Sequence, residues 1–335
     1  MNHSTALDLY QHADLATLMR LADEKRKQIK GSTGVVTYQI DRNINITNVC
    51  CSGCKFCTFH CKLSQRDLAY ITTLEEYAVK IEELNAKGGN QILLQGGMHP
   101  QLGLDYYEQL FRDLKIISPT LKLHALGAPE VFYLAKKAGV SVSVALERLV
   151  RAGLDSLPGA GAEILDDKWR KENSPAKCSA GEWIETMEVA QDMGLLTSAT
   201  MMYGFRDSAE LRIKHLFEIG ELQARTGGFL AFIPWPYRGV ENPMPSLSEY
   251  LRIVAIARLV LTNVENIQAS WLTTGVKTGQ MALHGGANDL GSIMIEENVV
   301  RSAGVDFVMD EVRMRQTISE VGFTPMLRDQ GYNIL

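Results

Sequence analysis

Five of the six cysteines in this chain lie within one short stretch, between Cys50 and Cys61. Within it, Cys50, Cys54 and Cys57 have the spacing C-x3-C-x2-C, and an aromatic residue, Phe56, stands directly before the last of them. Three thiolates so close together can bind three corners of a [4Fe–4S] cube. The fourth iron then has no protein ligand and stays open to a small molecule. The spacing therefore predicts a cluster that takes part in chemistry.

Two other kinds of cysteine site fit this stretch less well. A disulfide framework is disfavoured because a chain of 335 residues can bury a sufficient core without covalent cross-links. A structural zinc site needs four closed ligands, and His60 or Cys61 would have to be the fourth. Such sites usually pair two separated C-x2-C knuckles, and this sequence has no second one.

A ferredoxin-like cluster is the main alternative. Four cysteines spell the run C-x2-C-x2-C-x3-C: Cys51, Cys54, Cys57 and Cys61. That run normally ends in proline and is matched by a second run elsewhere in the chain. Here Lys62 follows the last cysteine, and Cys178 is the one cysteine left over. The open-cluster interpretation is therefore favoured.

Composition narrows the class of protein. Apolar residues make up 46% of the chain, the formal net charge is −5 and the isoelectric point is about 5.9. No basic field is available for nucleic acid or an anionic membrane. The apolar stretch Ile253–Val264 contains Arg258 and is too short to span a bilayer. Met1–Tyr10 does not read as a signal peptide, and clustered free cysteines suit a reducing compartment, so we expect a cytoplasmic protein.

Short apolar or β-branched runs alternate with longer amphipathic stretches along the chain. The expected strands are Val35–Ile40, Gln91–Leu94, Leu121–Ala125, Asp155–Leu157, Thr197–Met202, Phe229–Ile233, Ile267–Ser270 and Met281–His284. The expected helices include Thr73–Lys87, Asp105–Ile117, Cys178–Met193 and Ser246–Leu261. Thr73 with Glu76, and Ser179 with Glu182, have the spacing of capping boxes.

This alternation predicts an α/β fold with a parallel sheet. Eight strands over about 250 residues are typical of a (β/α)8 TIM-type barrel, or of an incomplete relative of one, formed as a single domain. We expect the barrel and a C-terminal extension to span residues 35–335. Residues 1–34 are expected to form an N-terminal helical segment that packs on the barrel.

Loops rich in glycine or polar residues follow the expected strands. Residues of interest on these loops are Gly96, Gly97, Glu163, Arg238, Thr273 and Asp289, with Ser270 at the end of the seventh strand. Barrel enzymes build their sites at the C-terminal ends of the strands. Because the cysteine stretch follows the first strand, we expect it to share one site with these residues.

Together these features resemble the radical S-adenosylmethionine (SAM) superfamily, which combines such a cysteine loop with a Gly-Gly turn after the second strand. Asn45–Cys50, Gly96–Pro100 and Gly159–Leu165 resemble the branch that acts on futalosine derivatives and deazaflavin precursors. Within that branch, Ile267–Thr273 and Gly286–Val300 are most similar to the cyclic dehypoxanthinyl futalosine synthases. The resemblance covers nearly the whole chain.

The resemblance implies a [4Fe–4S] cluster on Cys50, Cys54 and Cys57, with SAM bound at the open iron. It also implies a 5′-deoxyadenosyl radical that takes a ribose hydrogen from dehypoxanthine futalosine, closing a ring in menaquinone biosynthesis. A one-electron donor such as flavodoxin or ferredoxin would be needed. Two alternatives stay open. One is a sister enzyme, either aminofutalosine synthase or a deazaflavin-forming subunit that uses tyrosine. The other is an iron–sulfur electron carrier.

By the same resemblance, four residues would bind SAM: Phe56, Gly96, Gly97 and Glu163. The glutamate would accept the ribose hydroxyls of SAM, although a first-turn glutamate that stabilises the next helix is an equal reading of the sequence. The turn after the second strand departs from the superfamily pattern, because Met98 stands where Gly-Gly-Glu has its acid. Contacts to SAM at this turn would then come from the backbone.

The remaining candidates are acid/base and substrate-binding residues. Asp289 is the preferred base for the proton lost when the aromatic ring is restored, with His99 and His284 after it. The benzoate carboxylate of the substrate needs a cationic or hydroxyl partner. Candidates on the sixth and seventh loops are Arg238, Ser270 and Thr273.

Overall fold

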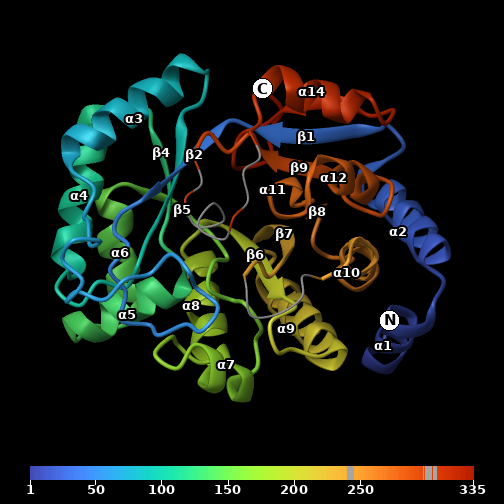
Figure 1. Cartoon of the computed structure of the whole chain (residues 1–335), viewed down its shortest axis with the longest axis horizontal. Coiled ribbons are helices and arrows are strands. Elements are labelled where there is room, and N and C mark those ends of the chain that lie inside the picture. The colour runs from blue at the N-terminus through green and yellow to red at the C-terminus, as the bar shows by residue number, and fades with distance from the viewer. Residues whose placement is uncertain (240–244, 297, 299–303, 305–307) are drawn as a thin grey trace.

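A parallel sheet of seven strands forms the centre of the fold. The computed structural model describes residues 1–239, 245–296, 298, 304 and 308–335. The strands are β2 (Asp41–Asn45), β3 (Gln91–Gln95), β4 (Lys122–Ala125), β5 (Leu154–Leu157), β6 (Leu196–Tyr203), β7 (Phe229–Pro236) and β8 (Asn266–Ile267). They pair in chain order. Each crossover therefore leads to the neighbouring strand, and the sheet curls as it does in a barrel (Figure 1).

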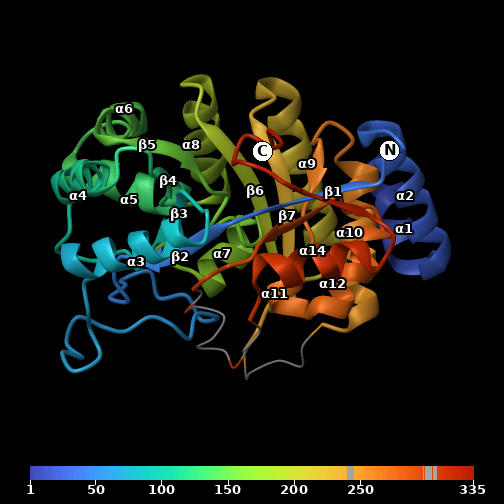
Figure 2. The ribbon, with the colours of Figure 1, turned by 90° about the horizontal axis from the view of Figure 1, so that it is seen from above.

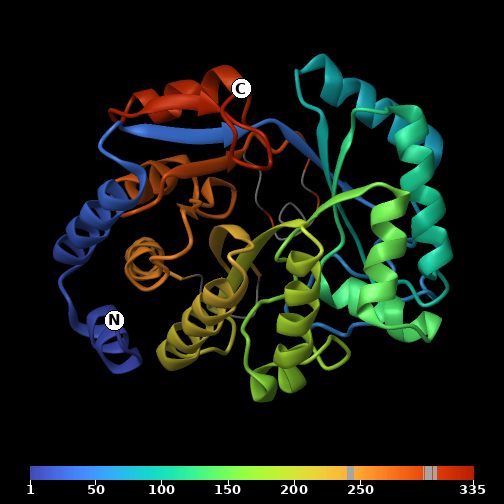
Figure 3. The same cartoon turned by 180° about the vertical axis from the view of Figure 1, so that it is seen from behind.

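A second parallel sheet, of three strands, lies between β8 and β2. Its central strand is β1 (Val35–Gln39), flanked by β9 (Asp289–Ser292) and β10 (Thr324–Leu327). β1 leads into β2 within one residue, and an isolated bridge joins Gln268, after β8, to Asp289 at the start of β9. The two sheets together come close to a closed barrel (Figure 3). This confirms the expected single-domain α/β barrel in its incomplete form.

Helices cover the outer face of the main sheet (Figures 1 and 3). Those after β2 are α3 (Leu74–Ala86), α4 (Leu104–Ile117), α5 (Ala128–Ala138), α6 (Val142–Ala152), α7 (Asp167–Asn173), α8 (Ala180–Asp192), α9 (Ala209–Thr226), α10 (Leu247–Val260), α11 (Trp271–Thr274), α12 (Val276–Leu283) and α14 (Glu311–Ser319). The apolar faces of the longer helices bury residues such as Phe111 of α4 and Trp183 of α8. This burial supplies most of the stability of an amphipathic helix.

Two helix starts confirm the capping boxes expected from the sequence. In α3 the Thr73 side chain accepts from the backbone N–H of Glu76, whose carboxylate accepts from the N–H of Thr73. In α8, Ser179 and Glu182 make the same reciprocal pair. These bonds satisfy backbone groups that a helix start otherwise leaves without partners.

One strand expected from the sequence is absent from the described residues, and one strand of the main sheet was not expected. Met281–His284 is not a strand: it ends α12, where the buried residues Gly279, Ala282 and Leu283 have helical spacing. Asp289 therefore begins a strand instead of following one. The strand that leads into the cysteine stretch is β2, of sequence Asp-Arg-Asn-Ile-Asn, and all five of its residues are buried. A strand with four polar residues gives no hydrophobic signal.

The N-terminal residues form two helices, α1 (His3–His12) and α2 (Leu15–Lys30). Leu18 and Ala22 of α2 pack with Ala255 of α10 in a small buried cluster. Figure 1 shows both helices beside α10 and α9, on the outside of the barrel. Among the residues that the structure describes, no helix is both long enough and apolar enough to cross a membrane.

A buried ion pair fixes the C-terminal tail to the smaller sheet. Arg328, after β10, donates to Asp289 through Nε at 2.6 Å and Nη2 at 3.0 Å. Thr37 and the N–H of Gly291 also donate to this carboxylate, at 2.5 and 2.8 Å. Both side chains of the pair are nearly or fully buried, with exposed fractions of 2% and 0%. Breaking such a pair leaves an uncompensated charge in the interior.

We predict that Arg328→Met lowers the free energy of unfolding by about 3–5 kcal/mol, because the Asp289 carboxylate loses its cation without gaining water. Urea denaturation measures the loss. The control is Arg225→Met, which breaks an exposed pair with Glu188 and should cost less than about 1 kcal/mol. Equal small losses in both variants would contradict the importance of the buried pair.

Candidate functional site

A cavity with a volume of about 410 Å³ lies inside the curled sheet. Its wall includes residues from the loops after β2, β3, β5, β7 and β8, which meet at the C-terminal ends of the strands. At the other end the wall reaches Gln330 of the tail, which is hydrogen-bonded to Gln91 at the start of β3. The cavity therefore runs from the cysteine loop into the barrel interior.

The cysteine loop after β2 brings three thiols to the cavity. Among the described residues that line it, the cysteines are Cys50, Cys54 and Cys57. Cys51 is exposed, and Cys61 is buried away from this wall. In Figure 2 the segment after β2 extends from the sheet on the side where α11 lies. The structure thus groups the thiols in the C-x3-C-x2-C register.

Hydrogen bonds hold the first of these thiols. The backbone N–H groups of Met98 and Ser52 donate to Cys50 Sγ at 3.3 and 3.4 Å. The Ser52 hydroxyl lies 3.0 Å from Cys50 Sγ and 3.3 Å from Cys54 Sγ. Donors of this kind stabilise thiolates and tune the potential of an iron–sulfur cluster. The donor set therefore fits such a cluster.

The three thiols differ in their electrostatic surroundings. Burial alone raises the pKa of Cys57, but hydrogen bonds from His60 and from the N–H of Phe59 outweigh it and lower the pKa. Burial raises the pKa of Cys54, which Lys177 and Ser52 offset only in part. Within the described ranges, no three His, Cys, Asp or Glu side chains converge tightly enough to hold a single ion. A cluster does not require this, because each thiolate binds a different iron.

The turn after β3 packs against the cysteine loop. A Cβ on Gly97 would lie 2.2 Å from the Val49 carbonyl oxygen and 2.8 Å from Cys50 Cβ. The N–H of Gly97 donates to Thr47 O at 2.8 Å, and the N–H of Cys51 donates to Met98 O at 3.0 Å. Gly96 and Gly97 both line the cavity. Because neither glycine has a side chain, the backbone of this turn can lie directly against the backbone of the cysteine loop.

Glu163 lies on the cavity wall after β5, with a φ of 46° that non-glycine residues rarely adopt. Its Oε1 accepts a hydrogen bond from Lys177 Nζ at 3.0 Å, and both side chains are largely buried. The N-cap of the following helix α7 is Asp166, whose Oδ1 accepts from the N–H of Trp169. Glu163 is therefore not the cap of that helix, which removes one alternative role.

Phe56, within the cysteine loop, packs against two other aromatic rings. Its ring stacks on Trp169 at 5.9 Å between centroids and meets the edge of Phe205 at 5.7 Å. Lys177 Nζ lies 5.6 Å from the centroid of the Phe56 ring. This packing fixes the ring next to the thiols and places a buried cation close by.

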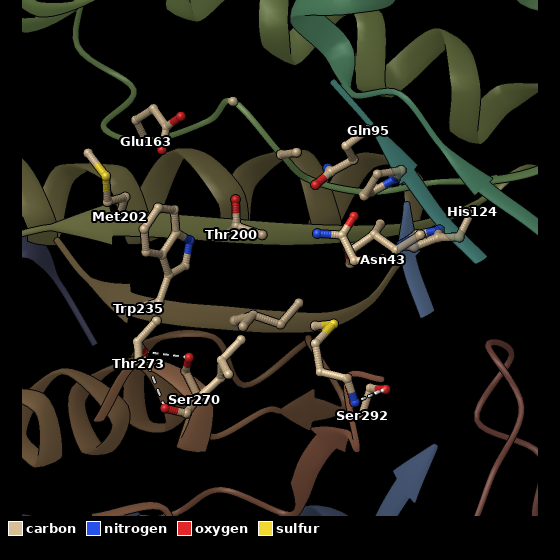
Figure 4. A pocket seen from close by; sticks show the side chains of 18 of the residues that line it. Asn43, Gln95, His124, Glu163, Thr200, Met202, Trp235, Ser270, Thr273 and Ser292 are labelled. Atoms are coloured by element: carbon tan, nitrogen blue, oxygen red, sulfur yellow. Dashed lines mark hydrogen bonds between the residues drawn. The ribbon is translucent and has the colours of Figure 1, made fainter. Parts of the chain in front are cut away.

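The expected substrate-binding residues also line the cavity. Thr273 lies on α11 and Ser270 is its N-cap residue, and their hydroxyl oxygens are 2.7 Å apart (Figure 4). Trp235 faces them from β7, and Arg238 lies just beyond that strand. Burial lowers the pKa of Arg238. A bound anion beside it would favour the charged form of the guanidinium.

The sequence did not identify the polar side chains in the barrel interior. Asn43, Gln95, His124 and Thr200 project from β2, β3, β4 and β6 into the cavity (Figure 4). Nδ1 of His124 lies 2.7 Å from the Ser156 hydroxyl, and burial lowers its pKa to about 3. Its ring is therefore neutral at physiological pH.

The three acid/base candidates lie away from this wall. Asp289, His99 and His284 are not among the described residues that line the cavity. Asp289 is held in the ion pair with Arg328. His99 is buried, and its Nδ1 accepts from the N–H of Gln101. His284 is exposed at the end of α12, and its ring contacts that of Phe323 in a tilted arrangement. The acid/base roles of these three residues stay predictions, and the structure places each of them outside the cavity lining.

Two further charged residues of the cavity wall were not predicted: Lys177, on the loop after α7, and Glu130, at the start of α5. Lys177 follows α7 in the segment Ser-Pro-Ala-Lys-Cys, and Glu130 is the third residue of α5. No local pattern marks either residue. A search for charged residues on every loop after a strand would have found Glu130, because it lies just after β4.

Two family models match the chain. The model of the radical SAM superfamily matches residues 44–218. The model described as the CofH/MqnC C-terminal region matches residues 226–335. The first range contains the cysteine loop and the Glu163–Lys177 pair, and the second contains α11 and the smaller sheet's strands β9 and β10.

Several characterised proteins are similar in sequence. Cyclic dehypoxanthine futalosine synthase of Streptomyces coelicolor is 44% identical over 336 residues, which cover 98% of this chain and 84% of that protein. The synthase of the same name from Halalkalibacterium halodurans is 38% identical, and the match covers 90% of this chain and 82% of that synthase. The 5-amino-6-(D-ribitylamino)uracil–L-tyrosine 4-hydroxyphenyl transferase of Archaeoglobus fulgidus is 39% identical, covering 94% of this chain and 93% of its own.

Solved structures share the fold at low sequence identity. The FeFe-hydrogenase maturase HydG of Carboxydothermus hydrogenoformans superimposes with a TM-score of 0.77 at 14% identity, covering 99% of this chain and 77% of HydG. Methylornithine synthase (PylB) gives a TM-score of 0.71 at 17% identity, covering 98% of this chain and 93% of PylB. The curled sheet and its helices are thus an established architecture.

We predict that serine at Cys50, Cys54 or Cys57 abolishes the cluster, because each thiol faces the cavity. Cys51→Ser and Cys61→Ser serve as matched controls and should keep about four irons per chain after anaerobic reconstitution. Iron content and the absorbance of the cluster measure this. Iron lost from Cys51→Ser but kept in Cys50→Ser would reverse the assignment toward the ferredoxin-like register.

Proposed function

The chain belongs to the radical SAM superfamily, and from this premise we propose that it cyclises dehypoxanthine futalosine to cyclic dehypoxanthinyl futalosine in menaquinone biosynthesis. Superfamily members use a [4Fe–4S] cluster and SAM, and this protein is an enzyme of that kind. The observation that carries the substrate proposal is the 44% identity to the Streptomyces coelicolor synthase across 98% of the chain. We further propose that it acts in the cytoplasm with a small electron donor such as flavodoxin or ferredoxin.

In this proposal the cluster is held by Cys50, Cys54 and Cys57. When bound and reduced, the cluster and SAM supply a 5′-deoxyadenosyl radical. The backbone of Gly96 and Gly97 forms the wall beside the cluster site, and Glu163 accepts the ribose hydroxyls of SAM. Lys177 holds the Glu163 carboxylate in place through its hydrogen bond at 3.0 Å. These residues bind and orient, and they perform no covalent step.

The substrate would occupy the part of the cavity beyond SAM. Arg238, Ser270 and Thr273 line that part and offer one cation and two hydroxyls, a donor set that suits a benzoate carboxylate. Trp235 and Trp271 add apolar wall. A wall of this kind excludes water from a reactive radical. Asp289 does not line the cavity, but it would fix the position of Arg328, which does, by accepting its hydrogen bond.

A second candidate function is transfer of a 4-hydroxyphenyl group from tyrosine. Its support is the 39% identity to the Archaeoglobus fulgidus transferase over 94% of the chain. The cysteine loop and the SAM-binding residues would serve both reactions equally. The two functions therefore differ in the substrate end of the cavity, around α11.

With SAM, a reductant and dehypoxanthine futalosine, we predict equal amounts of cyclised product, methionine and 5′-deoxyadenosine, because the abstracted hydrogen is not returned. Anaerobic assays with chromatography of all three products measure this. The same assay is run with tyrosine and 5-amino-6-(D-ribitylamino)uracil. Turnover of that pair, with dehypoxanthine futalosine left unchanged, would replace the proposed reaction by the transferase.

We also predict that Glu163→Gln weakens SAM binding by about tenfold, since a hydrogen bond to a charged acceptor is lost. Because Glu163 also pairs with the buried Lys177, the variant should lose stability as well, so SAM affinity is the deciding measurement. The control is Asp166→Ala, which removes the N-cap of α7 and should lower stability by about 1 kcal/mol while SAM affinity is kept. If Glu163→Gln lowers stability and leaves SAM affinity unchanged, the residue is structural.

A further inference from the structure

A second carboxyl group on the wall of the same cavity, that of Glu130, has one buried oxygen that accepts no hydrogen bond from the described residues. Glu130 is the third residue of α5 and lines the cavity wall after β4. Its Oε2 is buried, and no hydrogen bond reaches it in the part of the chain that the structure describes. A buried carboxylate oxygen without a donor costs free energy, so such groups are rare in folded proteins. The position suggests that a ligand supplies the donor.

Glu130 lies in the first turn of α5 and its carboxylate is stabilised by its own backbone N–H, but this contact leaves Oε2 without a donor. A glutamate in the third position of a helix often reaches back to the N-cap backbone. Here the N-cap is Gly127, and no side-chain capping bond is made at this helix start. A Cβ on Gly127 would lie 2.8 Å from Glu130 Oε2. The glycine therefore leaves room for the carboxyl group but does not bond it.

The charges around Glu130 favour a cationic ligand. Lys177 is the nearby ammonium, and its hydrogen bond goes to Glu163. Burial raises the pKa of Glu130, and Lys177 offsets this only in part. Two carboxyl groups thus share one ammonium, and one more positive charge would balance them.

The neighbouring turn lacks an acid of its own. Met98 stands after Gly96-Gly97, where the superfamily pattern has glutamate. Its side chain is buried, and its N–H is used by Cys50 Sγ. β4 pairs directly with β3. The start of α5, which follows β4 and carries Glu130, therefore lies next to this turn at the same edge of the sheet.

We propose that Glu130 binds the α-ammonium group of SAM, as the carboxylate that the Gly96-Gly97-Met98 turn does not supply. This rests on the use of SAM in the proposed function and is independent of which second substrate reacts. SAM carries one ammonium and one sulfonium against a single carboxylate. Its net positive charge matches the excess negative charge of Glu130 and Glu163 over Lys177.

The test compares two ligands in two proteins. Anaerobically reconstituted wild type and Glu130→Gln are titrated with SAM and with the analogue that lacks only the amino group. We expect Glu130→Gln to weaken SAM about tenfold or more, the value of a hydrogen bond between charged groups. Affinity for the deaminated analogue should change less than about twofold. Iron content and the spectrum of the reduced cluster show that the variant is folded and loaded.

Glu147→Gln is the matched control, because Glu147 is an exposed glutamate on α6 with 45% of its side chain accessible. It should leave both affinities unchanged. Equal weakening of both ligands by Glu130→Gln would mean that Glu130 acts on another part of SAM or on the fold, and would overturn the proposal. An unchanged SAM affinity would also overturn it. A wild type that binds SAM but ignores dehypoxanthine futalosine would refute the proposed substrate and leave this result intact.

Discussion

The close contact between two backbones, at Gly97 and Val49, is the constraint on which the site depends. A side chain on residue 97 would overlap the Val49 carbonyl at 2.2 Å. Because that space is free, the turn after β3 can lie directly on the cysteine loop and exchange hydrogen bonds with it. The N–H of Met98 then reaches Cys50 Sγ. A long loop of 28 residues, from Ile46 to Thr73, thereby places its thiols at one fixed edge of the sheet.

The second feature of the site is a buried cluster of charge beside those thiols. Lys177 donates to Glu163 and shares the cavity wall with Cys54 and Glu130. The opposite side, formed by β7 and α11, carries Trp235 and Trp271 with a few hydroxyls. A charged half suits a zwitterionic cosubstrate, and an aromatic half suits an aryl substrate. The charged half is consistent with the cosubstrate of a radical SAM enzyme.

Local patterns predicted much of this structure, and long-range contacts account for what they missed. The spacing of Cys50, Cys54 and Cys57 and the two capping boxes lie within a few residues, so the sequence shows them directly. β2 was missed because its polar residues are buried by partners elsewhere, as Arg42 is by Glu296. His284 and Asp289 were misplaced because an apolar run before glycines reads equally well as a strand or as a helix end.

The buried charges could not be found in this way, because Glu130 and Lys177 meet only when the sheet has curled. The same holds for Asp289, whose partner Arg328 comes from the tail. An acid in a glycine-rich segment is compatible with a catalytic base or with an ion pair. Only the packing of β9 against β1 distinguishes these two roles.

The central claim is that three thiols hold a cluster with one open iron that binds SAM. Mössbauer spectroscopy of protein reconstituted with ⁵⁷Fe, recorded before and after addition of SAM, tests it most directly. The account predicts that the signal of one iron in the cluster changes on addition of SAM, since that iron alone gains new ligands, while the other three keep theirs. A spectrum in which all four irons are equivalent and unaffected by SAM would contradict it.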